Sequence, residues 1–300
     1  MKSAIDSNMG PELHNRLNRC REILRSLGSV VVAFSAGVDS TFLLALAVET
    51  LGSRNVLAAM GISPSLPQRE RQAGRRIAHQ IGVELVEVET TELSDPHYVS
   101  NPPDRCYYCK INLFKRLKKL SARRGIRAVV SGANADDTGD FRPGLLACKE
   151  LDIRNPLLEA GLTKKEIRLA SRAMGLETWN KPAMACLATR VPYGDRITIE
   201  KLQRIDQAES ILKDLGFSQC RVRDHDVLAR IEVPTDEIAK VVEFRETLIA
   251  SLKSLGYIYI TLDMEGFRSG SMNESLTTEI RLEPRERNAS HLDSRKTNHA

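Results

Sequence analysis

Short apolar runs alternate along the chain with longer segments whose apolar residues recur every three or four positions. The short runs, rich in β-branched residues, predict buried strands at residues 30–34, 55–60, 83–89 and 127–131. The helical spacing predicts helices over residues 11–27, 40–51, 67–80, 106–124 and 163–174. Ser65 is a candidate cap for the third helix, and Thr163 with Glu166 forms a capping-box pattern at the fifth. Strands alternating with helices are typical of an α/β fold with a doubly wound parallel sheet.

The pattern changes near Lys181. After it, the sequence predicts a helix at 200–215, a hairpin through CRVRDHDVLARIEV, a helix at 235–255 and a strand in YIYITLDM. Val227, Ala229, Ile231 and Val233 alternate as in a half-buried strand. We therefore predict a first domain at residues 1–180 and a smaller α+β substrate-binding domain at 181–275. The tail at 276–300 is charged and poor in large apolar residues, which predicts disorder.

Composition narrows the class of protein. The chain has 300 residues, of which 42% are hydrophobic and 28% charged, as in a soluble globular protein. No apolar run is long enough for a membrane span, and the first residues lack the apolar core of a signal peptide. We therefore expect a cytoplasmic protein without a membrane partner. A net charge of +5 is a weak signal for nucleic-acid binding but suits anionic small molecules.

A small, polar turn separates the first predicted strand from the next helix. In parallel sheets, ligands bind where strands end and helices begin, and small residues let backbone N–H groups approach phosphate oxygens. Ser35, Ser40 and Thr41 add hydroxyl donors. Asp39 repels phosphate unless it holds a divalent cation or caps the helix. No Walker lysine follows, and a turn chosen only for helix capping is the alternative.

Six cysteines in a cytosolic chain do not indicate a disulfide framework. Cys106 and Cys109 form a CxxC pair at a helix start, where the dipole favours thiolates, and Cys186 lies at the predicted domain junction. The pair alone fits half a zinc site, a redox pair or coincidence, although the lack of a second CxxC argues against a zinc ribbon. A pair with a distant third cysteine suits a [4Fe–4S] cluster with one open iron. The other cysteines are interpreted as core or incidental residues, with Cys148 in a loop: Cys20, Cys148 and Cys220.

Several motifs resemble known families. SAGVDS resembles the PP-loop, SGGxDS, of ATP pyrophosphatases, except that Ala36 replaces a glycine. Its methyl group would crowd a pyrophosphate, or be harmless if φ is negative. SGANADD at residues 131–137 resembles the second, acidic motif of that superfamily. Five motifs then occur in the order of the LarE family of ATP-dependent sulfur transferases, over residues 11–274: NPPDRCYYCK, SGANADDTGDFRPG, ACLATRVPYG, CRVRDHDVLARIEV and LDMEGFRSGSMNE.

This resemblance implies adenylylation of the carboxylates of pyridinium-3,5-biscarboxylic acid mononucleotide and their conversion to thiocarboxylates. It implies ATP, Mg²⁺ and a [4Fe–4S] cluster as cofactors, with Asp39 and Cys186 as catalytic residues. Cys106, Cys109 and Cys186 would bind the cluster, although some family members instead sacrifice the sulfur of the junction cysteine. The implied nucleotide-binding residues are Ser35, Ala36, Gly37, Val38, Asp39, Ser40, Thr41, Met60, Gly132 and Asp137.

The second domain would hold the substrate phosphate through arginines, whose planar guanidinium groups match phosphate geometry. The candidates are Arg190, Arg221, Arg223 and Arg268, with Arg196 beside them; a solvated basic face is the alternative. Tyr107 or Tyr108 would stack on the pyridinium or merely pack the loop, and His225 reads as a polar hairpin residue. The expected partners are a small nucleotide, a sulfide donor and further copies of the chain in a homo-oligomer. A [4Fe–4S]-dependent tRNA thiolase and a nucleotide-binding sensor are the competing interpretations.

Overall fold

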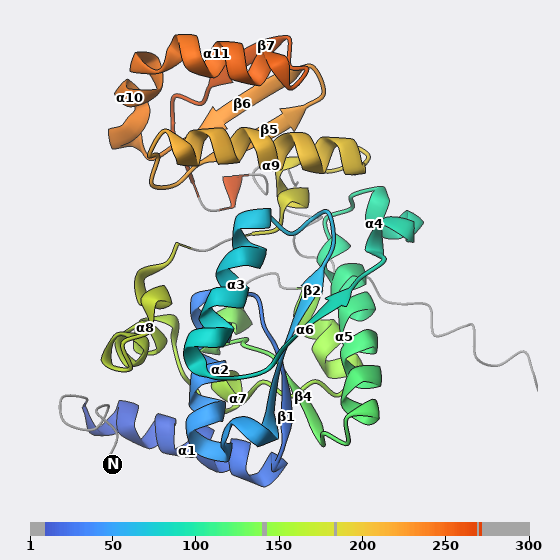
Figure 1. The fold of residues 1–300 in the computed structure, drawn as a ribbon, viewed down its shortest axis with the longest axis vertical. Helices are drawn as coiled ribbons and strands as arrows, with labels where there is room; N and C mark the ends of the chain where they lie inside the picture. The colour runs from blue at the N-terminus through green and yellow to red at the C-terminus, as the bar shows by residue number, and fades with distance from the viewer. Residues whose placement is uncertain (1–9, 140–142, 183–184, 269, 272–300) are drawn as a thin grey trace, which may run out of the picture. The chain divides into compact units, whose positions relative to one another are not determined.

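The computed structural model describes residues 10–139, 143–182, 185–268 and 270–271. Four parallel strands form the first sheet in the order β3-β2-β1-β4 (Figure 1). In this sheet Val31 lies opposite Leu57 on one side and Val129 on the other. The predicted parallel α/β sheet is confirmed. Its strands are β1 (Val30–Ala33), β2 (Val56–Ile62), β3 (Leu85–Glu89) and β4 (Ala128–Val130).

Helices cover both faces of this sheet, because successive side chains of a strand point to opposite faces. Val30 and Val32 of β1 belong to one core cluster, whereas Val31 between them belongs to another. The helices against the first face are α1 (Pro11–Leu27), α2 (Val38–Leu51), α3 (Gln68–Ile81), α7 (Pro156–Glu159) and α8 (Lys164–Ala173). Those against the second are α5 (Arg105–Arg123) and α6 (Pro143–Glu150). The doubly wound arrangement is therefore confirmed.

Local signals at the helix starts were right at one helix and wrong at another. At α8 both halves of the capping box are present: the Glu166 N–H donates to Thr163 Oγ1, and the Thr163 N–H donates to the Glu166 carboxylate at 2.9 Å. At α3 the N-cap residue is Pro67, which has no capping side chain, and the Gln68 N–H instead donates to Asp206 Oδ2 at 3.3 Å. Ser65 is instead buried, with its hydroxyl 2.7 Å from that of Tyr98. A tertiary contact has taken the place of the expected cap.

A second, three-stranded sheet follows α9 (Ile199–Asp214), in the order β5-β6-β7. Strands β5 (Arg221–His225) and β6 (Leu228–Glu232) are antiparallel, as the hairpin pattern predicted, and β7 (Tyr259–Leu262) is parallel to β6. Val227, expected in the strand, lies in the hairpin turn and is 47% exposed. A small α+β domain with a mixed sheet therefore follows the first domain.

The single helix predicted at 235–255 is wrong. The segment forms a 3₁₀ turn (Thr235–Glu237) and two helices, α10 (Ile238–Glu243) and α11 (Arg245–Ser254). The break falls at Phe244, whose ring packs edge-on against Phe217 at 6.3 Å between centroids. The apolar residues of the two helices keep the same spacing because both helices pack on one core. Apolar periodicity therefore cannot reveal that the segment forms two helices rather than one.

Short elements complete the described chain: α4 (Pro96–Val99) and the 3₁₀ turns Ser53–Asn55, Glu92–Ser94, Ala135–Gly139, Glu177–Asn180 and Leu187–Arg190. In the part of the chain that the structure describes, no helix is both long and apolar enough to cross a membrane. The cytoplasmic location and the domain boundary at residue 181 stay predictions. The tail expected at 276–300 lies outside the described residues.

Candidate active site

The small, polar turn lies between β1 and α2, at the carboxyl end of its strand. The Thr41 N–H donates to the Gly37 carbonyl at 3.0 Å, which starts the helix. The Ser40 hydroxyl lies 3.0 Å from that of Ser35 and accepts the Ser35 N–H at 3.2 Å. Val38 is buried in the core beneath. All seven predicted PP-loop residues thus lie in one turn that opens a helix, where an anion is favoured.

Ala36 has a left-handed backbone, with φ of +56°. The Ala36 methyl group was expected from the sequence to be harmless if φ were negative, and that condition is not met. An alanine in this region costs about 1–2 kcal/mol, so neighbouring contacts must hold it there. Lys181 supplies such a contact, because its ammonium donates to the Ala36 carbonyl at 3.0 Å and to Glu70 on α3 at 2.6 Å.

Asp39 has two unlike carboxylate oxygens. Oδ2 accepts a hydrogen bond from the ammonium of Lys164 at 2.5 Å, whereas Oδ1 is buried and has no hydrogen-bond partner within the described residues. Burial raises the pKa of Asp39, an effect that Lys164 opposes and the negative charge of Asp137 reinforces. A buried, unsatisfied carboxylate oxygen is costly unless something binds it. It fits a hard cation such as Mg²⁺, which prefers oxygen ligands.

The acidic motif packs against this turn. A Cβ added at Gly132 would lie 3.0 Å from the Ser40 backbone nitrogen and 3.2 Å from the Asp39 carbonyl carbon, so only glycine fits the approach. Asp137 accepts the Asn134 N–H at 3.0 Å and lies close enough to Asp39 to affect its pKa. Both predicted residues of the motif are therefore beside the PP-loop.

Met60 occupies a different position. Its side chain is 1% exposed, in the core beneath α3, where its Sδ and Cε abut Gly74. Two residues that sequence reasoning missed lie at the turn instead, Lys164 and Lys181. A basic residue directly after the Thr163 cap, and another opening the KPAM segment, were the available signals.

The CxxC pair lies at the start of α5. Cys106 is exposed in the first turn, and Cys109 is partly buried one turn later. Cys109 and Cys186 both pack against the apolar cluster that contains Tyr98. Burial raises the pKa of Cys109, and the negative charges of Glu92, Cys186 and Cys106 raise it further. Burial and these charges therefore oppose the Cys109 thiolate, and the three thiols lie close enough to interact electrostatically.

The remaining cysteines are buried, which fits their interpretation as core residues: Cys20, Cys148 and Cys220. Cys148 lies in α6, not in a loop. Across the described ranges, no three Cys, His, Asp or Glu side chains are grouped as ligands of a metal ion.

Arg190 holds the backbone around Cys186. Its side chain is fully buried, and its Nη1 donates to the carbonyls of Ala185 and Cys186 at 2.8 and 3.0 Å. Its Nε and Nη2 donate to the Glu209 carboxylate at 2.8 and 2.9 Å. Arg190 is therefore built into the support of the Cys186 turn, a contact that sequence reasoning missed together with Glu209.

Arg221 and Arg223 lie on the same face of β5, and both are buried. Arg223 donates twice to Glu232 at 2.8 Å and once to the Thr189 carbonyl at 2.7 Å. The Arg221 guanidinium lies 5.1 Å from the ring centroid of Phe267. Burial, with the positive charges of Arg190 and Arg223, lowers the pKa of Arg221 to about 10. Arg190 and Arg223 are paired with Glu209 and Glu232, and their positive charges act on the buried Arg221.

The other substrate candidates have protein partners. Arg268 pairs with Glu265 at 2.9 Å, whereas Arg196 is exposed. The Tyr107 hydroxyl donates to Glu150 at 2.6 Å.

Tyr108 and His225 are the remaining residues that the sequence analysis considered for the second domain's ligand. Tyr108 stacks on His97 at 5.2 Å between ring centroids. Burial lowers the pKa of His225.

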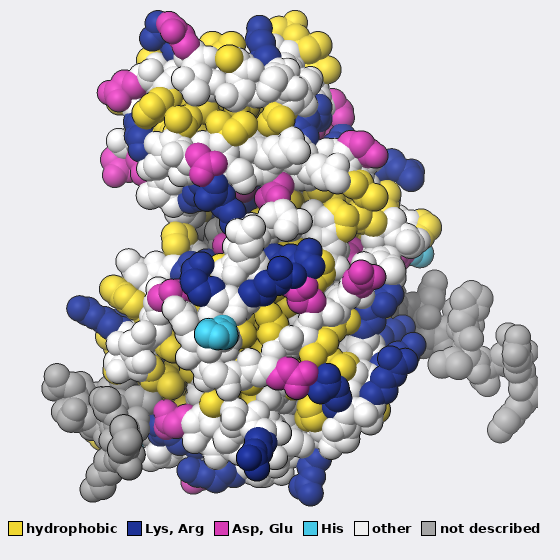
Figure 2. Space-filling view, viewed as in Figure 1, with side chains coloured by type: hydrophobic (Ala, Val, Ile, Leu, Met, Phe, Trp, Pro, Cys, Tyr) yellow, Lys and Arg dark blue, Asp and Glu magenta, His cyan; other side chains and the backbone are white. Residues whose placement is uncertain are grey.

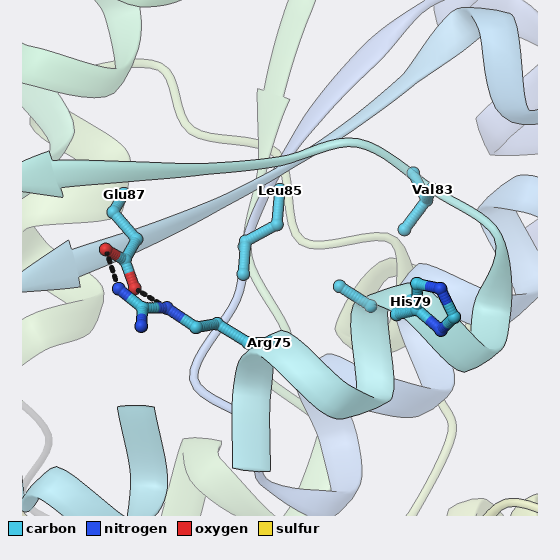
Figure 3. A pocket seen from close by; sticks show the side chains of 6 residues that line it. Arg75, His79, Val83, Leu85 and Glu87 are labelled. Carbon is cyan, nitrogen blue, oxygen red and sulfur yellow. Dashed lines mark hydrogen bonds and ion pairs between the residues drawn. The ribbon is translucent and has the colours of Figure 1, made fainter. Parts of the chain in front are cut away.

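A shallow hollow lies away from these residues, between α3 and β3 (Figure 3). Its lining includes Arg75, His79 and Glu87 and none of the predicted site residues. Glu87 accepts two hydrogen bonds from Arg75 at 2.7 Å and two from Arg71 at 3.0 and 2.8 Å. On the face shown in Figure 2, basic side chains are likewise interspersed with acidic ones. The net positive charge is therefore not gathered into one patch on that face.

Comparisons with known proteins place the chain in a family. Residues 15–116, which include the PP-loop and the CxxC pair, match the NAD synthase family. The chain is 41% identical over 267 residues to an uncharacterized protein of Synechocystis, covering 88% of this chain and 99% of that protein. It is 39% identical over 254 residues to the pyridinium-3,5-bisthiocarboxylic acid mononucleotide synthase of Lactiplantibacillus plantarum, covering 85% and 92%. An uncharacterized protein of Methanocaldococcus jannaschii is 28% identical over 240 residues, covering 80% and 91%.

The match to the synthase runs through both domains at an identity far above chance. The chain therefore belongs to the family of pyridinium-3,5-bisthiocarboxylic acid mononucleotide synthases, the LarE family that its motifs resemble.

Proposed function

We propose that the chain is an ATP-dependent sulfur transferase acting on pyridinium-3,5-biscarboxylic acid mononucleotide. A substrate carboxylate oxygen would attack the α-phosphorus of ATP, forming an acyl adenylate and releasing pyrophosphate. Sulfide would then attack the carbonyl carbon, and the carbon–oxygen bond to AMP would break, leaving a thiocarboxylate. The match to a mononucleotide synthase over 85% of the chain favours this small substrate over a tRNA.

The observation that carries the proposal is the PP-loop with its two lysines. Backbone N–H groups and hydroxyls of residues 35–41 lie at the start of α2, where they would bind an anion such as the ATP phosphates. Lys164 lies at Asp39 and Lys181 at Ala36, so both add positive charge beside the loop. The unpartnered Oδ1 of Asp39 suits Mg²⁺, which when bound stabilises the charge of the pyrophosphate leaving group.

The substrate phosphate would bind at the guanidinium cluster of the second domain. Arg221 and Arg223 share one face of β5, and their charges repel each other in a buried setting. A phosphate dianion would offset that repulsion through charge-assisted hydrogen bonds. Arg190 would contribute charge to the cluster while it holds the Cys186 backbone.

Cys106, Cys109 and Cys186 would hold a [4Fe–4S] cluster. Support comes from the donor chemistry, three thiols, and from their closeness, since Cys106 and Cys186 both affect the pKa of Cys109. A cluster with three protein ligands supplies an iron open to exogenous sulfide. The rival is transfer of the sulfur of Cys186 itself, which breaks its Cβ–Sγ bond and leaves dehydroalanine.

Replacing Asp39 with Ala tests the ATP chemistry. We expect pyrophosphate release to be abolished, because the carboxylate that suits Mg²⁺ is lost, while the melting temperature stays close to that of the parent chain. The measurement is AMP and pyrophosphate formed in the presence of substrate and Mg²⁺. Asp236→Ala is the matched control, because Asp236 is exposed in a distant 3₁₀ turn. Formation of ADP and phosphate by the parent chain would show that the PP-loop assignment is wrong.

Mass spectrometry of the protein after turnover separates the two sulfur sources. With a cluster, we expect an intact Cys186 and several turnovers on added sulfide, with iron bound in anaerobically purified protein. Sacrifice would remove about 34 Da at Cys186, the mass of hydrogen sulfide, which is outside the usual oxidation products of cysteine. That loss, or full activity without iron, would contradict the cluster.

A further inference from the structure

Asn101 is an unusual residue in the segment that leads to the CxxC pair. It is fully buried and has a left-handed backbone, with φ of +54°. It lies between α4 and α5, four residues before Arg105, the first residue of α5. Few side chains other than glycine adopt this backbone region, and asparagine is among them.

The Asn101 side chain and backbone bind a distant segment of the chain. Its Nδ2 donates to the carbonyls of Val191 and Pro192, at 3.2 and 2.6 Å. The Gly194 N–H donates to the Asn101 carbonyl at 3.0 Å, and the Ile197 N–H donates to the Val99 carbonyl at 3.0 Å. Four hydrogen bonds thus join residues 99–101 to residues 191–197, about ninety positions later in the sequence.

The second half of the contact runs through Arg105. Its Nη1 donates to Asn101 Oδ1 at 2.5 Å, and its guanidinium lies 5.1 Å from the ring centroid of Tyr193. Arg105 is itself buried, at 4% exposed. The amide of Asn101 therefore bonds the first residue of α5 on one side and the segment after Cys186 on the other.

This contact lies between the CxxC pair and Cys186, the two parts of the cysteine site. Arg105 directly precedes Cys106, and the 3₁₀ turn Leu187–Arg190 lies between Cys186 and Val191. The Leu187 N–H is held in turn by the Ser65 carbonyl at 2.9 Å. A glycine would satisfy the backbone at position 101, but only an amide adds two donors and an acceptor there.

We infer that Asn101 is a positioning residue that docks the Cys186 segment on the start of the CxxC helix. The inference rests on the proposed function, because it concerns the same three cysteines. Asn101 would touch neither substrate nor sulfur, and would act through Arg105 and residues 191–194. Its loss leaves the PP-loop intact and separates the two parts of the cysteine site.

The test measures how fast a bifunctional thiol reagent, dibromobimane, bridges Cys186 to Cys106 or Cys109 in the full chain, with the linked peptides identified by mass spectrometry. Asn101→Gly keeps the left-handed backbone and removes the amide. Each lost hydrogen bond contributes about 1 kcal/mol, so two lost donors should slow bridging about tenfold or more. Asn101→Asp, which keeps the acceptor and loses the donors, should slow it as well.

Asn55→Gly is the matched control, because the Asn55 amide donates to the Leu51 carbonyl at an exposed site; its bridging rate should equal that of the parent chain. A folded Asn101→Gly variant that bridges at the parental rate overturns the inference. Loss of cooperative melting in both Asn101 variants also overturns it, because the residue would then serve the whole fold. Bridging needs neither ATP nor substrate, so failure of the proposed function appears separately, as a parent chain that forms no AMP.

Discussion

Glu87 on β3 and Glu232 on β6 are bound in the same way but at different depths. Each accepts hydrogen bonds from two arginines, Glu87 from Arg71 and Arg75 of α3, and Glu232 from Arg223 and Arg230. The Glu87 side chain is 23% exposed, whereas that of Glu232 is fully buried. We call each glutamate with its two arginines a triad. The triad of the first sheet lies at the surface, and that of the second sheet is centred on a buried carboxylate.

The difference in depth changes what each triad does. Near water, an ion pair contributes little, because solvent screens it and hydrates its members once they separate. In the interior, the same charges are costly unless paired, so each depends on the other. The second sheet and the neighbouring turn Leu187–Arg190 thus carry buried guanidinium groups, Arg223 held by Glu232 and Arg190 held by Glu209. Such a preorganised positive cluster suits an anionic substrate.

The largest expected effect comes from removing the buried carboxylate. Glu232→Ala leaves Arg223 buried without its main partner, so the free energy of unfolding should fall by about 3–5 kcal/mol. Glu87→Ala, the same change in the surface triad, should cost at most about 1 kcal/mol for each lost pair. Urea unfolding of both variants at pH 7 measures the contrast. Equal losses would show that burial does not distinguish the two triads.

A smaller effect concerns the anion rather than the fold. Arg221→Ala should weaken binding of the pyridinium mononucleotide by about 1.5–3 kcal/mol, the contribution of a hydrogen bond to a charged group, and Arg223→Ala should act in the same direction. ATP binding should change little, because the PP-loop lies in the other domain. Isothermal titration calorimetry with each ligand provides the measurement.

Arg245→Ala on α11 is the control for this test, since Arg245 is exposed and pairs only with its neighbour Glu246 among the described residues. Equal weakening of both ligands by Arg221→Ala would indicate a folding defect and contradict the assignment of the phosphate site.

The smallest effect is a pH dependence of the surface triad. Hydrogen bonds from Arg71 and Arg75 lower the pKa of Glu87 to about 2. A depressed carboxyl pKa stabilises the fold above the unfolded value of about 4.3, and this contribution is lost as pH falls through the folded value. Glu87→Gln should therefore show a flatter dependence of stability on pH between about 4.3 and 2. Parallel acid titrations of the two proteins would refute the shift.

Much of the first domain could be predicted from sequence because its burial is apolar. All four residues of β1 are apolar and three are fully buried, so the run of valines alone indicates a central strand. In β5, Arg221, Arg223 and Asp224 are buried as deeply as Val222. Burial of that kind depends on partners such as Arg204 and Tyr257, which bond Asp224 from elsewhere in the chain, and hydropathy cannot reveal them.

The candidate site shows the same limit. The PP-loop, Gly132 and the three cysteines lie in short sequence motifs, so they could be predicted from the residues next to them in the sequence. Lys164, Lys181, Glu209 and Asn101 act through contacts with residues far away in the chain. Arg190 was found by its motif, but its full burial and its bonds to the Cys186 backbone follow only from the folded chain.

Ala36 bears on how this nucleotide-binding loop is defined as a motif. A glycine there would relieve about 1–2 kcal/mol of backbone strain, which exceeds the cost of about 0.4–1 kcal/mol from the greater freedom it gives the unfolded chain. The balance of the two terms therefore favours glycine, and alanine at this position depends on neighbouring contacts such as the hydrogen bond from Lys181 to its carbonyl. A search for this loop that demands glycine at both positions would therefore miss this chain, in which a lysine from outside the loop binds the strained residue.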